Sequence, residues 1–152
     1  MKAEEKRIAD VIRSAFRGVS LGGGVGLMQG QGLDDYADAE TIAEYRANDQ
    51  KDDWTLLDPD RLNSCHSSLS FFDAEGMRFH LPAYLIADLE GTLNQDIIFH
   101  LTYRADDAMS RFILLNPQQR NAVREFLLFR LADSDFEREM IDAALATYWR
   151  SL

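Results

Sequence analysis

The fold of this chain depends on the stretch Ser68-Leu69-Ser70-Phe71-Phe72-Asp73-Ala74-Glu75-Gly76-Met77-Arg78-Phe79-His80-Leu81-Pro82-Ala83-Tyr84-Leu85, its densest run of large apolar residues. Burial of apolar surface is the dominant favourable contribution to folding. We therefore expect this stretch to lie at the centre of the core. Two of the three histidines, His66 and His80, lie in or beside it.

The segments on either side of residues 73–76 follow different periodicities. Asp58-Pro59 supplies an N-cap and a first-turn proline, which predicts that a helix starts there. Apolar residues at helical spacing follow it, namely Leu62, Cys65, Leu69 and Phe72. Asp73 and Gly76 suit a type I turn, and the alternation after it is typical of a strand. We expect at most one short strand pair near residues 69–81, and then a helix opened by Pro82.

The rest of the chain is patterned mainly for helices. We expect them in four further places: over residues 3–17, over residues 39–48, from Asn116-Pro117, and from Ser134-Asp135. Residues 96–103 fit a short helix or a strand, and residues 112–115 look extended. The expected fold is therefore mainly α, a single compact domain over residues 1–152 with about six helices.

A glycine-rich segment interrupts this pattern, because seven of the nine glycines lie between Gly18 and Gly32. Glycine loses the most backbone entropy on ordering, so we expect a loop over residues 18–32. The segment lacks the Lys and the Ser or Thr that would complete a phosphate-binding loop, which argues against a nucleotide site.

The composition narrows the classes of partner. The formal net charge is −10, and clusters of Lys and Arg are missing from the sequence, which argues against nucleic acid and anionic membranes. A basic protein or a divalent cation fits this charge better. We find no apolar run of the ~20 residues that a membrane span needs and no apolar region after the charged N-terminus, so we expect a cytoplasmic protein. The single cysteine, Cys65, is expected to be a buried core residue.

Candidate site residues gather around the turn. His66, Glu75 and His80, with Asp73 nearby, could form an open metal site, although their spacing matches no metal motif. The alternative, which we favour, is that His66 caps or bonds the backbone near the turn while His80 faces solvent beside Arg78. We also expect Arg78 to pair with the carboxylates of the turn. We expect neither a bound metal nor a cofactor.

A second candidate site follows the glycine-rich segment at Asp34, Asp35 and Tyr36. Paired carboxylates on a loop can hold a cation or a substrate, or one of them can cap the next helix. The sequence leaves both alternatives open.

The string from Ser67 to Tyr84, together with Leu33-Asp34-Asp35-Tyr36, Asn116-Pro117-Gln118-Gln119-Arg120 and Tyr148-Trp149-Arg150, resembles a family of small bacterial proteins of unknown function. The resemblance covers most of the chain and implies a stand-alone domain, but it brings no catalytic residues. We therefore expect a protein-binding or accessory module. The alternative is a metal-dependent, hydrolase-like enzyme that uses His66, Glu75 and His80.

Overall fold

The computed structural model describes residues 1–103, 109–133, 135 and 137–151, and these residues form one mainly helical, compact body. Eight α-helices and three short 3₁₀ helices are found among the described residues, and none of these residues lies in a strand. In chain order the elements are α1 (Ala3–Ala15), α2 (Leu27–Asp34), α3 (Ala39–Asn48), η1 (Trp54–Leu56), α4 (Pro59–Ser64), η2 (Ser68–Ser70), α5 (Ala74–Leu89), α6 (Ile97–Thr102), η3 (Ser110–Phe112), α8 (Pro117–Asp133) and α9 (Arg138–Ala146).

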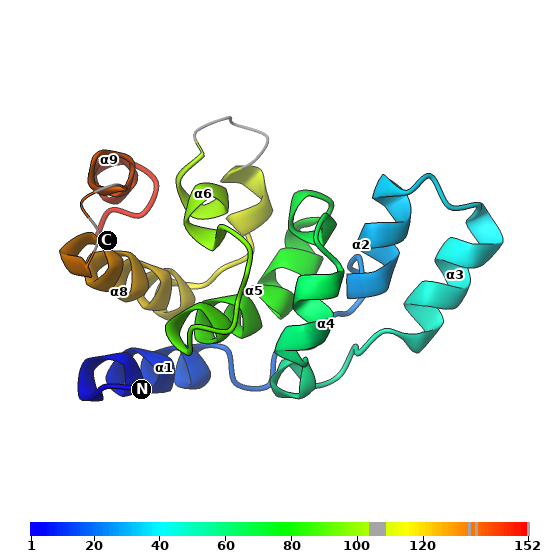
Figure 1. Cartoon of the computed structure of the whole chain (residues 1–152), viewed down its shortest axis with the longest axis horizontal. Helices are drawn as coiled ribbons and strands as arrows, with labels where there is room; N and C mark the ends of the chain where they lie inside the picture. Colours follow the sequence, from blue (N-terminus) through cyan, green and yellow to red (C-terminus); the bar gives the residue numbers. More distant parts are fainter. Residues whose placement is uncertain (104–108, 134, 136, 152) are drawn as a thin grey trace.

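Helix α5 is the centre of the molecule, with α1, α4, α6, η1 and η3 packed around it (Figure 1). Asp73 caps it by accepting a hydrogen bond from the backbone N–H of Gly76 at 2.8 Å. The strand pair expected near residues 69–81 is wrong. The helix is buried on most of its circumference, so apolar residues occupy every face and produce an alternation that only resembles a strand.

Proline 82 lies inside α5 and does not start a new helix, which corrects a second expectation. Pro82 has no N–H to donate to the carbonyl of Arg78, a loss that typically costs about 3 kcal/mol in a helix interior. Burial of the flanking residues Leu81 and Leu85, both fully buried, offsets that cost and keeps the helix continuous.

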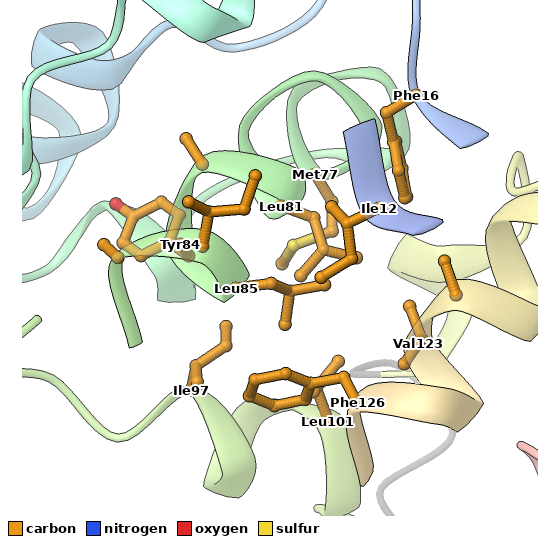
Figure 2. Close-up of a cluster of buried hydrophobic side chains, with 14 of the residues drawn as sticks. Ile12, Phe16, Met77, Leu81, Tyr84, Leu85, Ile97, Leu101, Val123 and Phe126 are labelled. Carbon is orange, nitrogen blue, oxygen red and sulfur yellow. The ribbon is translucent and has the colours of Figure 1, made fainter. Parts of the chain in front are cut away.

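The core joins α5 to both ends of the chain. Figure 2 shows side chains from α1, α6 and α8 converging on those of α5. Its labelled members are Ile12, Phe16, Met77, Leu81, Tyr84, Leu85, Ile97, Leu101, Val123 and Phe126. The two tryptophans close the core and satisfy their indole N–H groups, Trp54 on the carbonyl of Phe16 and Trp149 on that of Leu101, each at 2.8 Å.

The predicted helices near the chain ends are confirmed in outline. Helix α1 ends two residues earlier than expected, and α3 covers residues 39–48 as expected. Helix α8 starts with the predicted capping box, in which Asn116 and Gln119 exchange backbone-to-side-chain hydrogen bonds of 3.0 and 2.8 Å. The expected cap of the last helix included Ser134, which lies outside the described residues.

Two local expectations fail because tertiary packing overrides spacing, and one segment that the sequence left open is resolved. The helix that starts at Pro59 stops at Ser64, and η2 carries the chain to α5, although the four apolar residues predicted to share a face are all buried. The ambiguous segment is helix α6, capped by Asp96. Of residues 112–115, expected to be extended, Phe112 ends η3 and residues 113 and 114 form a turn.

Only the first part of the glycine-rich segment is a loop. Residues 27–34 form α2, which contains Gly30 and Gly32, so the expected loop over 18–32 is wrong in its second half. Close packing explains these glycines, since a Cβ on Gly32 would lie 2.9 Å from the side chains of both Ile42 and Tyr45 in α3. No helix in the described part of the chain is long and apolar enough to cross a membrane.

Candidate functional site

The carboxylates at the start of α5 hold the glycine loop. Asp73 accepts a second hydrogen bond, from the backbone N–H of Val25 at 3.0 Å, and Glu75 accepts one from Gly23 at 3.2 Å. The loop lies so close to α5 that a Cβ on Gly24 would come within 2.6 Å of the Gly76 nitrogen. Asp73 and Glu75 are therefore structural ligands of backbone N–H groups.

His80 is fully buried and neutral. Its ring stacks on Phe72 with 4.2 Å between centroids, and its Nδ1 lies 2.7 Å from the carbonyl oxygen of Gly76. Burial lowers the pKa of His80 from 6.5 to about 4, because the interior disfavours the charged imidazolium. The Nε2 atom has no hydrogen-bond partner in the described structure. His80 is thus a core side chain that solvent does not reach, and the expectation that it faces solvent is wrong.

The residues proposed as a metal site are not brought together. His66 is exposed between α4 and η2, whereas His80 is buried within α5. No group of three His, Cys, Asp or Glu side chains that could hold a metal ion occurs among the described residues. The expected ion pair of Arg78 with the carboxylates of the turn is also wrong, since Arg78 forms none within the described part of the chain.

The other candidate residues lie on one surface. Asp34 accepts a hydrogen bond of 2.8 Å from the hydroxyl of Ser67, which brings the end of α2 next to His66. Asp35 is the C-cap of α2 and is exposed. We call the group Leu33, Asp34, Asp35, Tyr36 and His66 the α2–η2 surface.

Neither carboxylate of Asp34 or Asp35 caps α3. Asp38 does so, accepting a hydrogen bond of 2.8 Å from the backbone N–H of Thr41. Asp35 is instead held by the side-chain amide of Gln31 at 3.2 Å. The carboxylate of Asp35 is therefore free of any capping role and faces solvent.

Tyr36 is the most unusual residue of the α2–η2 surface. Its φ is +56°, in the left-handed region, and 94% of its surface is exposed. It is the only non-glycine residue with positive φ in the described part of the chain. The chain reverses here because Ala37 donates to the carbonyl of Gly32 at 3.0 Å, a helix ending that normally uses glycine.

Cys65 is confirmed as a core residue. It is 1% exposed, and its Sγ lies 3.3 Å from the sulfur of Met28. Burial raises the pKa of the thiol, which disfavours the thiolate that a nucleophile requires.

A cavity of about 550 Å³, which no sequence pattern indicated, is formed by the end of α1, the loop after it, α5 and the start of α8. Arg17 and Arg78 line it, and they are 61 positions apart in the sequence. No local pattern could have identified it, since its two charged residues come from different helical segments.

Comparison with known proteins gives a family without an assigned activity. A family of unknown function (DUF6714) matches residues 4–152. No curated protein matches the chain, and no solved structure does. This match confirms that the chain resembles a family of unknown function. The bacterial origin of that family stays a prediction. Because the match spans nearly the whole chain, the protein belongs to this family of unknown function, DUF6714.

Proposed function

We propose that this protein is a small binding module that docks a basic segment of a partner protein on the α2–η2 surface. The observation that carries the proposal is Tyr36, a large aromatic side chain held in solvent by a left-handed backbone. Strained residues of this kind cluster at functional sites, where the strain serves a purpose beyond stability.

A tyrosine at position 36 does not stabilise the fold, because its backbone is strained and its ring packs against almost nothing. A left-handed backbone costs a residue with a Cβ roughly 1–2 kcal/mol, and glycine avoids this cost. Exposure of 94% means that the ring regains almost nothing by packing within the chain. Tyrosine is among the residues that contribute most at protein interfaces, because its rigid ring buries a large area at a low entropic cost.

The charged residues near Tyr36 are acidic, which favours a positively charged partner. Asp34 and Asp35 precede it and Asp38 follows it, while the nearest basic residue along the chain is Arg46. Arg46 is engaged elsewhere, donating to the carbonyl oxygens of Gly22 at 2.7 Å and Gly24 at 3.2 Å. A cationic segment would therefore meet carboxylates beside an aromatic ring that can accept cation–π contacts.

Packing and hydrogen bonds hold the α2–η2 surface in a fixed conformation. Helices α2 and α3 pack closely through Gly32 and lie at the opposite end of the molecule from α1, α8 and α9 (Figure 1). The carboxylate of Asp49 anchors the start of α2 by accepting from the backbone N–H groups of Met28 and Gln29 at 2.8 and 3.1 Å. A partner would thus dock on a pre-organised surface and lose little entropy in ordering it.

A random peptide library displayed on phage tests this proposal. We expect the protein to select peptides rich in Lys and Arg, and the selected peptides to bind Tyr36→Gly at least about tenfold more weakly, as for a hot-spot residue. Tyr103→Ala is the matched control, since Tyr103 is 50% exposed and lies on a different element. Selection of peptides without basic residues, or equal binding to Tyr36→Gly, would refute the proposal.

A further inference from the structure

The cavity between α1, α5 and α8 differs in charge from the rest of this acidic chain. Its lining residues come from the end of α1, the loop after it, α5, the segment before α8 and the first turn of α8. Two of them are arginines and none is an Asp or Glu, in a chain whose formal net charge is −10. The cavity is therefore a local basic site.

Neither arginine of the cavity is neutralised within the described part of the chain. Arg17 and Arg78 form no ion pair or hydrogen bond there, and the Nε of Arg78 is buried without a partner. Other arginines differ: Arg7 pairs with Glu4 at 2.7 Å, and Arg130 pairs with Asp88 at 2.9 Å. A guanidinium has five N–H donors, so Arg17 and Arg78 both have donors that no other side chain of the described part engages.

Neutral polar groups complete the cavity. Ser14 and Ser20 line it, as does Gln118 at the second position of α8. Backbone N–H groups at such a position have no partner inside the helix and favour negative charge. The side-chain oxygens of Asn116 and Gln119 accept backbone hydrogen bonds in the capping box, and the amide of Gln119 donates to the carbonyl of Ala15 at 3.2 Å, so Gln119 is held in the wall.

We propose that this cavity binds a small organic anion through a phosphate or carboxylate group held by Arg17 and Arg78. The volume of about 550 Å³ lies within the range of small-molecule sites. Arginine is the residue best suited to the task, because its planar fork matches the oxygens of both phosphate and carboxylate. The proposal is independent of docking at the α2–η2 surface, since the two sites share no residue.

An NMR titration of the ¹⁵N-labelled full chain with inorganic phosphate, citrate and chloride, at constant ionic strength, tests the proposal. We expect saturable shifts in the amides of Gly18, Ser20 and Gln118 with phosphate or citrate, and none with chloride. Saturation by phosphate identifies a phosphate-bearing ligand, and saturation by citrate a polycarboxylate. Shifts with neither anion, or equal shifts with all three, would overturn the proposal.

Substitutions assign the binding to the two arginines. We expect Arg78→Gln and Arg17→Gln each to weaken binding at least about tenfold, as for loss of a charged hydrogen bond. Arg13→Gln is the control, because Arg13 lies on α1 near the cavity but pairs with Asp10 at 3.3 Å. Undiminished affinity in Arg17→Gln would overturn the proposal even if Arg78→Gln failed to fold, since Arg17 is exposed. Tyr36→Gly should bind the anion as the wild type does, which separates this site from the α2–η2 surface.

Discussion

Protonation of His80 should make the protein unstable in mild acid. The folded-state pKa of His80 is about 4, whereas an imidazole in the unfolded chain titrates near 6.5. Because the unfolded chain takes up the proton first, stability is complete above pH 6.5 and is lost as the pH falls towards 4. Each unit of pKa difference between the folded and unfolded states is worth about 1.36 kcal/mol, so the free energy of unfolding falls by about 3 kcal/mol in total.

The contribution of His80 is isolated by comparison with His80→Gln, whose side chain does not titrate. Urea unfolding at about pH 7.5 and about pH 4.5 should show the wild type losing about 2.5 kcal/mol more than the variant between the two values. The variant itself starts lower, because it loses the stack on Phe72. The buried Trp54 and Trp149 report unfolding by fluorescence.

The comparison removes the other groups that titrate in this range. Burial lowers the pKa of His100 to about 4 as well, and it raises the pKa of the carboxyls of Asp49 and Asp88, which oppose the histidines. These groups are common to both proteins, so they cancel in the difference. A difference below about 0.5 kcal/mol, the size of an ordinary surface substitution, would refute the burial argument.

Three further substitutions test the structural assignments by urea unfolding at neutral pH. Tyr36→Gly should raise the free energy of unfolding by about 0.5–1 kcal/mol, because relief of the left-handed strain exceeds the added entropy of glycine in the unfolded chain; a loss of stability would show that the ring packs on the fold. Gly24→Ala should lower the free energy of unfolding by about 1–3 kcal/mol, since its Cβ would meet backbone atoms of α5. Gly23→Ala is the control and should be nearly neutral, because its Cβ meets only a side-chain oxygen at 3.8 Å. Equal effects of the two substitutions would contradict the close approach of the loop. Asp73→Ala should cost about 2 kcal/mol or more through loss of the cap and of the bond to Val25, and a cost below about 0.5 kcal/mol would argue against this double role.

Local capping signals predicted the first residues of two helices, α4 and α8, correctly. Asn116 and Gln119 form the predicted capping box, and Asp58-Pro59 starts a helix as expected. These signals worked because a cap depends on a few neighbouring residues whose hydrogen bonds form within one turn. Burial of Cys65 followed from its place among apolar residues at helical spacing.

The largest errors concern segments in contact with distant parts of the chain. Helix α5 resembled a turn and a strand because it is buried on most of its circumference, and α2 resembled a loop because α3 approaches its glycines closely. Asp73 and Glu75 could not be assigned as ligands of the glycine loop, since the loop precedes them by about 50 residues. Periodicity carries no information about such partners.

The sequence by itself determined a mainly helical chain, the starts of α1, α3, α4 and α8, the acidic charge and the central place of residues 68–85. Only the tertiary structure decided that the turn carboxylates bind backbone, that Tyr36 stands strained in solvent, and that Arg17 and Arg78 share one cavity. The physical reason is the separation of the interacting residues along the chain. Caps and apolar periodicity involve residues within one or two helical turns of each other. Burial, close backbone approach and cavities depend instead on which distant segments meet.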